Sequence, residues 1–292
     1  MDHQKIKLLQ AYIELTKPRI LSLVLVTTTL GFFLGGKGIH SFLKLFITLA
    51  GAGLVCAGAS ALNQYLERES DSKMVRTKNR PIPQGIISAN DAMLFGIILI
   101  LGGIFILATQ INILTAFLSL LTAFLYVLVY TPLKKISWLN TSIGAIPGAI
   151  PPMGGWAAAH GDLNLGAGVL FLILFIWQHP HFYAIAWMFK EDYKKGGFKM
   201  LPVIEPDGKN TFRQIIFFSV LLIPIALLPT IIGMSGGIYF WGALTLSLSL
   251  CAIGLGSAAS KSINDAQRLL KATVLYLPIL LLLIMIDVFF ST

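Results

Sequence analysis

The sequence predicts an all-α protein that crosses a membrane many times, and three observations lead to this fold class. First, 56% of its 292 residues are hydrophobic and only 12% are charged, whereas a soluble domain would carry about 25% charged residues. Second, the apolar residues form runs of the length that an α-helix needs to span a bilayer. Third, the basic residues gather in short segments between these runs, as they do in the loops of membrane proteins.

Nine segments are long and apolar enough to span the bilayer, which requires about 20 residues of helix. We expect them at residues 20–36, 41–65, 91–109, 112–130, 139–159, 164–188, 213–233, 237–259 and 270–290. The fifth segment is crowded with Gly and Pro. A helix can break where neighbouring helices or a water-filled cavity satisfy the freed backbone groups, so we expect a broken helix that lines a site. The nine spans would form one transmembrane domain over residues 1–292.

The distribution of basic residues predicts the topology. All but two of the Lys and Arg residues lie in the N-terminal tail and in the loops at 66–90, 131–138, 189–213 and 260–271. Because basic loops stay in the cytoplasm, we expect the N-terminus inside and the C-terminus outside. The net charge of +9 then reflects topology, and we expect no nucleic-acid partner. The N-terminus lacks a cleaved-signal or transit-peptide pattern, which favours a bacterial inner membrane.

Two of the basic loops, at 66–90 and 189–213, also contain several acidic residues. A positive-inside signal requires no carboxylates, so these loops need a second explanation. Charge beside the hydrocarbon region is costly unless water, a metal or a charged ligand compensates it. Because four spans separate the two loops, both lie on the same predicted side, and together they indicate a site at that face.

Asn63, Glu67 and Asp71 follow one another at intervals of four residues where the second span runs into the first of these loops. On an α-helix this spacing places the three on one face, whereas Glu69 points elsewhere. Carboxylate and amide oxygens at the end of a span suit Mg²⁺, which completes its coordination with water and substrate phosphates. A salt-bridged helix end with i, i+4 pairs is the alternative interpretation.

The basic residues beside this stripe would weaken a site for a metal alone, but they would favour a diphosphate bound through the metal. Arg76 and Arg80 could each contact phosphate oxygens through two N–H groups, and Lys78 adds a compact charge. The spacing and the charges together predict an Mg²⁺-diphosphate site at the cytoplasmic end of the second span.

Several separated motifs resemble those of the UbiA superfamily of intramembrane prenyltransferases. The stretch "NQYLERESDSKMVRTKNRP" from residue 63 is similar to the first acidic motif of that superfamily, commonly N-D-x-x-D-x-x-x-D, in the variant of the branch that modifies haem. The other similar stretches are "YTPLKK" at 130, "WLNTSIGAIPGAIPPMGGW" at 138, "HPHFYAIAW" at 179 and "KEDYKKGGFKMLPV" at 190. The resemblance covers nearly the whole chain. It implies a nine-helix UbiA-like bundle around a cytoplasm-facing cavity.

The resemblance also implies a reaction. The farnesyl group of farnesyl diphosphate would be transferred to the 2-vinyl group of haem B, with addition of water, to give haem O and diphosphate. Mg²⁺ would stabilise the departing diphosphate, and an apolar cavity would limit early capture of the allylic cation by water. The lipid bilayer would accommodate the farnesyl chain. The partners that this implies are the enzyme that forms haem A or a terminal oxidase.

By the same resemblance, Asn63, Glu67 and Asp71 would hold Mg²⁺ and serve catalysis together with Asp192. The second motif of the superfamily, D-x-x-x-D, keeps only this last acid, because Met188 occupies the other acidic position. The candidate contacts for diphosphate or a haem propionate are all basic: Arg76, Lys78, Arg80, Lys134, Lys190 and Lys194.

Two histidines of the sixth span, His179 and His181, are candidates for haem binding. A buried histidine in a bundle is more often a hydrogen-bonded core residue than a ligand, although imidazole is a common axial ligand of haem iron. Pro180 should bend the backbone between them and direct the two rings differently. The resemblance favours His181 over His179, with its role as iron ligand or as an aid to the vinyl chemistry left open.

Three other functions compete with this prediction. The first is prenylation of an aromatic quinone precursor, against which Glu67 and the "YTPLKK" and "HPHF" stretches argue. The second is ion-coupled transport, but the charges gather at one face and not at the membrane midplane. The third is a structural subunit of a respiratory complex, which would leave both acid-containing loops unexplained.

Overall fold

The computed structural model describes residues 3–291, and all regular structure within them is helical. Eight helices of this described part are long and apolar enough to cross a membrane. They confirm the predicted all-α, multi-pass membrane fold and correspond to every predicted span except the fifth. Seven of them are α2 (Pro18–Gly36), α3 (Phe42–Lys73), α4 (Ala89–Gln110), α9 (Leu165–Met188), α12 (Lys209–Ile231), α13 (Gly237–Ser260) and α14 (Ile263–Ser291). The eighth covers Ile113–Leu133 and begins with α5 (Ile113–Phe124).

The remaining helical elements are short. The span that begins with α5 continues through a π-helical turn, η1 (Leu125–Tyr130), and a last turn, α6 (Thr131–Leu133). Three further helices lie outside the spans: α1 (His3–Leu15), α10 (Lys190–Lys195) and α11 (Leu201–Ile204).

The fifth predicted span is divided into two helices, α7 (Asn140–Ala149) and α8 (Pro151–His160). A broken helix was expected here, and each half is too short to cross a bilayer alone. The break falls where Pro151 starts α8, because a proline supplies no N–H to the preceding turn. α8 packs very closely on α2, since a Cβ added at Gly155 would lie 1.9 Å from the carbonyl oxygen of Thr28.

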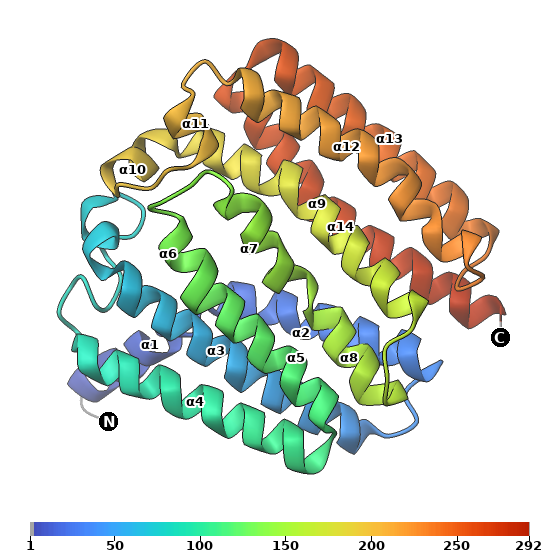
Figure 1. The fold of residues 1–292 in the computed structure, drawn as a ribbon, viewed down its shortest axis with the longest axis horizontal. Helices are drawn as coiled ribbons and strands as arrows, with labels where there is room; N and C mark the ends of the chain where they lie inside the picture. Colours follow the sequence, from blue (N-terminus) through green and yellow to red (C-terminus); the bar gives the residue numbers. More distant parts are fainter. Residues whose placement is uncertain (1–2, 292) are drawn as a thin grey trace. The chain divides into compact units, whose positions relative to one another are not determined.

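The chain forms two compact units, and Figure 1 labels their helices. Unit 1 comprises Met1–Asp162 and Glu191–Lys199, and unit 2 comprises Leu163–Lys190 and Met200–Thr292. The single transmembrane domain expected from the sequence stays a prediction.

Within unit 1, α3 packs along α4, and α2 packs along α8. The α3–α4 contact depends on glycines, since a Cβ at Gly58 would lie 2.4 Å from the carbonyl oxygen of Gly96. Small residues of this kind allow membrane helices to approach backbone to backbone. α3 begins at the N-cap Ser41, whose side chain accepts a hydrogen bond from the Lys44 N–H.

Within unit 2, α12 contacts both α9 and α13, while α14 contacts α13 and α9. Two buried tyrosines connect these helices through their hydroxyl groups. Tyr239 of α13 donates to the carbonyl oxygen of Ala226 at 2.8 Å, and Tyr276 of α14 pairs with Ser247 at 2.9 Å. Such bonds satisfy polar groups that the apolar interior would otherwise leave without a partner.

Candidate active site

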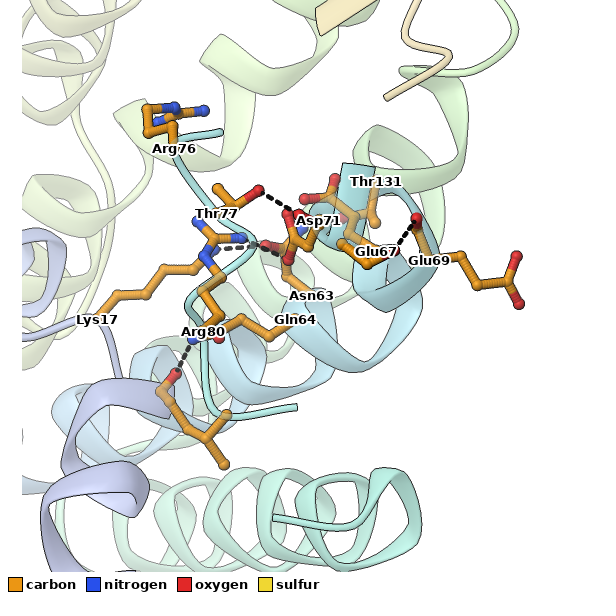
Figure 2. A network of polar contacts seen from close by, with 12 residues as sticks. Lys17, Asn63, Gln64, Glu67, Glu69, Asp71, Arg76, Thr77, Arg80 and Thr131 are labelled. Atoms are coloured by element: carbon orange, nitrogen blue, oxygen red, sulfur yellow. Dashed lines mark hydrogen bonds and ion pairs between the residues drawn. The ribbon is translucent and has the colours of Figure 1, made fainter. Parts of the chain in front are cut away.

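Asn63, Glu67 and Asp71 lie on one buried face of α3, as their spacing predicted. Their exposed fractions are 0%, 4% and 0%, whereas the Glu69 side chain is 77% exposed. Figure 2 shows Glu69 pointing away from the other acidic residues. Burying carboxylates without compensation would be very costly, so the surroundings must supply positive charge or hydrogen-bond donors.

Each member of this stripe is paired with a cation from another segment of unit 1. The Lys134 ammonium lies 2.7 Å from Oε1 of Glu67. In the loop after α3, the Arg80 guanidinium lies 2.6 Å from Oδ2 of Asp71. The Lys17 ammonium donates to Oδ1 of Asn63 at 2.5 Å. We call these six residues the α3 cluster: Lys17, Asn63, Glu67, Asp71, Arg80 and Lys134.

The π-helical turn after α5 orients the Asn63 amide. Thr131 Oγ1 donates to the carbonyl oxygen of Tyr126 at 2.8 Å. Thr131 Oγ1 in turn accepts a hydrogen bond from Asn63 Nδ2 at 2.9 Å. The amide oxygen of Asn63 is therefore directed away from Thr131 and toward Lys17. A π-helical turn is rare and often marks a functional site, which fits its place here.

Sequence reasoning missed Lys17, because it was counted with the basic N-terminal tail. It directly precedes Pro18, the first residue of α2, and adopts a left-handed backbone conformation with φ 51°. This conformation is uncommon for a residue with a Cβ and is typical of functional or strained positions. The sequence signal that could have found it is a lysine directly before the proline that starts a span.

Electrostatics differ between the two lysines of the α3 cluster. Burial is the largest single influence and opposes the charge on Lys134, but the attraction and hydrogen bond to Glu67, together with Tyr130 and Tyr126, outweigh burial and raise its pKa above the ordinary value. For Lys17, burial and then repulsion from Arg80 lower the pKa from 10.5 to about 7. Burial and the neighbouring Arg80 thus bring the pKa of Lys17 close to neutral pH, even though two carboxylates lie within the cluster.

The donor atoms of the stripe fit Mg²⁺. They are two carboxylates and one amide oxygen, which are hard ligands. Oδ1 of Asp71 is buried and has no hydrogen-bond partner among the described residues, so a bound cation would satisfy it. The described residues contain no group of three or more His, Cys, Asp or Glu that could hold a metal. An ion here would therefore need substrate or water oxygens to complete its coordination, as Mg²⁺ commonly does.

Asp192 contacts the loop that follows α3. Its two carboxylate oxygens accept hydrogen bonds at 3.0 Å from the backbone N–H groups of Val75 and Arg76. Burial is the largest single influence and opposes its charge, but the two backbone donors, together with the charges of Lys195 and Arg76, outweigh burial and lower its pKa below the ordinary 3.8. The Arg76 guanidinium lies 5.6 Å from the centre of the Tyr193 ring. Asp192 thus fixes the loop that carries Arg76 and Arg80, a role that the sequence did not predict.

The other predicted basic contacts lie outside the α3 cluster. Lys78 and Lys194 are exposed. Lys190 belongs to unit 2, where its ammonium lies 4.1 Å from the centre of the Trp187 ring and 3.4 Å from the carbonyl oxygen of Pro206. Of the six predicted basic residues, Arg80 and Lys134 pair with the carboxylates of the stripe.

The two histidines of α9 have different surroundings within unit 2. His179 is fully buried, its Nδ1 lies 2.8 Å from the carbonyl oxygen of Phe175, and its ring stacks on Phe218. His181 is half-buried and stacks on Trp177. Pro180 lies inside α9, which stays helical through it.

The tautomer of His181 follows from its hydrogen bond to Thr273. Thr273 Oγ1 donates to the carbonyl oxygen of Leu270 at 2.7 Å, so it acts as the acceptor toward His181 Nδ1 at 2.9 Å. The neutral ring therefore carries its proton on Nδ1 and its lone pair on Nε2. An imidazole oriented in this way is prepared to act as a ligand through Nε2.

The buried oxygen ligands of α3 and the cations beside them suit a divalent metal ion that is bound together with a phosphate group. The chain belongs to the UbiA prenyltransferase family, whose sequence profile matches residues 24–284.

The similar curated proteins include "Protoheme IX farnesyltransferase" of Solibacter usitatus, which is 45% identical over 285 residues and covers 94% of this chain and 98% of its own length. The protein with the same name from Koribacter versatilis is 43% identical over 291 residues, covering 96% and 94%.

Solved structures show the same fold at low sequence identity. One, described for digeranylgeranylglyceryl phosphate synthase, has a TM-score of 0.81 at 21% identity and covers 96% of this chain and 98% of its own. Another is a UbiA homologue from Archaeoglobus fulgidus bound to DMAPP and Mg²⁺, with a TM-score of 0.69 at 17% identity and coverage of 94% and 98%.

Proposed function

We propose that this protein transfers the farnesyl group of farnesyl diphosphate to the 2-vinyl group of haem B, with addition of water, and releases haem O and diphosphate. The observation that carries the diphosphate chemistry is the α3 cluster, in which buried oxygen ligands lie among three cations. The acceptor follows from similarity to the proteins named protoheme IX farnesyltransferase, which are 36–45% identical over nearly the whole chain.

Asn63, Glu67 and Asp71 would hold Mg²⁺ on the diphosphate. When bound, Mg²⁺ supplies Lewis-acid stabilisation of the charge that develops on the departing oxygens. The donor chemistry and the unsatisfied Oδ1 of Asp71 support this assignment. The Mg²⁺-bound UbiA homologue of Archaeoglobus fulgidus also supports it, although that likeness concerns the fold.

The cations of the α3 cluster would bind the diphosphate itself. Arg80 and Lys134 neutralise Asp71 and Glu67 when no ligand is bound, and they would exchange these carboxylates for phosphate oxygens when metal and diphosphate bind. Lys17 would act in the same way from the start of α2. Arg76 and Lys78, on the loop fixed by Asp192, would bind the outer oxygens or a haem propionate.

Two histidines of α9 are the candidate ligands for haem B. His181 is the preferred candidate ligand, because its half-buried ring presents the Nε2 lone pair while Thr273 fixes Nδ1. His179 is the second candidate, although its ring is buried against Phe218. Lys190 and Lys194 are the proposed propionate contacts on the second acid-containing loop.

We further propose a bacterial inner-membrane location with the N-terminus in the cytoplasm and the C-terminus outside. The concentration of Lys and Arg in the N-terminal tail and in alternate loops supports this orientation. Haem O would then be consumed by an enzyme that oxidises it to haem A or by a terminal oxidase.

The test is haem O formation by the purified protein in detergent with haem B, farnesyl diphosphate and Mg²⁺, scored by mass. The account predicts product that requires Mg²⁺ and that is lost in Glu67→Gln. Glu69→Gln is the matched control, since this glutamate lies on the same helix but is exposed. If a folded wild-type protein prenylates an aromatic acid and not haem B, the proposed acceptor is wrong while the diphosphate site stands.

A further inference from the structure

A long apolar groove lies in unit 2, between α12 and the end of α13. Its volume is about 730 Å³, and its lining residues come from α12, from α13 and from Lys261 just after it. Phe217, Val220 and Pro224 form one stripe of α12 along the groove, and all three are exposed. Ala258 of α13 lines the opposite wall, and its small side chain leaves the space open.

Three cations line one end of this groove: Lys209, Arg213 and Lys261. The described residues provide no acidic partner for the side chains of Lys209 and Arg213. The nearby acids are engaged otherwise: Asp207 accepts from the backbone N–H of Lys209, and Glu205 accepts from Asn210. Lys261 donates one hydrogen bond to the carbonyl oxygen of Asp207, which leaves further donors on its ammonium.

The apolar part of the groove is about as long, along the axis of α12, as one lipid leaflet is thick. From Arg213 to Pro224 the helix rises by about 16 Å at about 1.5 Å per residue. One leaflet contributes about half of the roughly 30 Å hydrocarbon thickness. An acyl chain lying along Phe217 and Val220 would therefore reach from the basic end of the groove to near the bilayer centre.

We propose that this groove is a binding site for an anionic phospholipid. Lys209, Arg213 and Lys261 would bind the phosphate and its net negative charge, and one acyl chain would lie along the apolar stripe of α12. Uncompensated basic groups at the end of membrane helices attract anionic headgroups. A zwitterionic lipid would fit less well, because its own cation would meet three like charges.

Haem also combines an apolar body with anionic groups, but the groove favours a lipid. None of the groove's lining residues is a histidine, cysteine or methionine, so it offers no side-chain ligand of the usual kind to haem iron. The proposal is independent of the prenyl-transfer reaction, since none of the groove residues belongs to the α3 cluster.

The experiment is native mass spectrometry of the full-length protein in detergent, titrated with phosphatidylglycerol or phosphatidylcholine. Wild type should retain phosphatidylglycerol more strongly than phosphatidylcholine. The combined variant Lys209→Gln, Arg213→Gln and Lys261→Gln should bind phosphatidylglycerol about a hundredfold more weakly, because each basic residue contributes roughly fivefold. The matched control replaces Lys73, Lys135 and Lys271 by Gln, since these are exposed and are not among the residues that line the groove.

Other outcomes would overturn the proposal. Equal loss of lipid in the control would show general attraction to basic loops, and no loss in the groove variant would exclude the site. Ala258→Phe provides a test that keeps every charge: it should fill the apolar groove and weaken phosphatidylglycerol binding about tenfold. Should the triple variant not fold, Arg213→Gln alone and Ala258→Phe decide the result. Displacement of the lipid by stoichiometric haem B would assign the groove to haem.

Discussion

The two loops that combine acidic and basic residues look alike in the sequence, yet the structure uses their acids in different ways. In the first, Glu67 and Asp71 are buried, and each is paired with a cation: Lys134, 67 residues away, for Glu67, and Arg80, nine residues away, for Asp71. In the second, Glu205 accepts hydrogen bonds from Asn210, and Asp207 accepts one from the Lys209 N–H. Both partners lie within a few residues of the acid and at the surface. Burial of the acids together with their cationic side-chain partners, and not local charge alternation, therefore distinguishes the candidate binding site from a capped helix end.

Asp192 differs from both groups of acids, because it connects the two loops. It belongs to the second loop in sequence, but it holds the backbone of the first loop through Val75 and Arg76. Its function is therefore to position the residues that follow α3. The comparison predicts a graded series of effects, from the α3 cluster through Asp192 to the acids of the α12 N-terminus.

Asp71→Asn should have the largest effect on activity. The change keeps the size of the side chain and one oxygen for Arg80, but it removes the charge of a proposed metal ligand. We expect kcat to fall by about 10² to 10³, the range found when a group that stabilises transition-state charge is removed. Haem O formation under saturating Mg²⁺ measures this, and a fall of less than tenfold would place the metal site elsewhere.

Lys17→Met should have the next largest effect. The substitution removes the ammonium that contacts Asn63 and keeps most of the apolar stem. Because a hydrogen bond to a charged group contributes more than a neutral one, we expect kcat/KM for farnesyl diphosphate to fall about 10- to 100-fold. Lys7→Met, an exposed position on α1, is the control. Equal activity of both variants would show that Lys17 serves only the start of α2.

Asp192→Ala should have an intermediate effect, chiefly on substrate affinity. Without the carboxylate, the backbone at Val75 and Arg76 loses its two acceptors. We expect KM for farnesyl diphosphate to rise about three- to tenfold while kcat changes little, since a misplaced loop weakens uniform binding. Asp192→Asn, which keeps one good acceptor, should restore part of the affinity. A variant that lowers kcat with KM unchanged would instead place Asp192 in contact with the reacting groups.

The contact made by Asp192 should be insensitive to pH in the neutral range. Its pKa is lowered in the folded protein, so the stabilisation is present above the unfolded pKa and is lost only as pH falls through the folded value. Hydrogen exchange at the Val75 and Arg76 amides, corrected for the intrinsic exchange rate, should show equal protection at pH 5.5 and pH 7.5. A loss of protection at pH 5.5 would contradict this assignment.

Glu205→Gln should have the smallest effect. Its carboxylate caps the start of α12 by accepting from Asn210, and the amide can still accept one of these bonds. We expect activity within about twofold of wild type and a stability change of about 0.5 kcal/mol or less, as for most surface substitutions. Thermal unfolding in detergent checks the second expectation. A loss comparable to that of Asp71→Asn would remove the distinction between the two loops.

Most of the helices could be predicted from the sequence, because a membrane-spanning helix is a long run of apolar residues. The fifth span was recognised as a segment with a break, which falls at Pro151, but its close packing on α2 through Gly155 could not be predicted, because it depends on a helix distant in the sequence. α3 also runs eight residues past its expected end at 65, to Lys73, because its polar face is buried and paired.

The sequence predicted the acidic stripe of the candidate site but not the pairing of its members with cations. Spacing alone placed Asn63, Glu67 and Asp71 on one face, because a helix fixes the positions of residues four apart. Their partners Lys17 and Lys134 come from segments 46 and 67 residues away. No local pattern encodes such a contact, which arises only when several helices pack together.

We propose that Asn63, Glu67 and Asp71 together hold a divalent ion that is bound with the diphosphate. Electron paramagnetic resonance with Mn²⁺ in place of Mg²⁺ tests it directly and does not depend on turnover. The account predicts that Mn²⁺ binds wild type in the presence of farnesyl diphosphate, that Asp71→Asn abolishes this binding, and that Glu69→Gln leaves it unchanged. Mn²⁺ bound equally by wild type and Asp71→Asn, with farnesyl diphosphate present, would contradict the account.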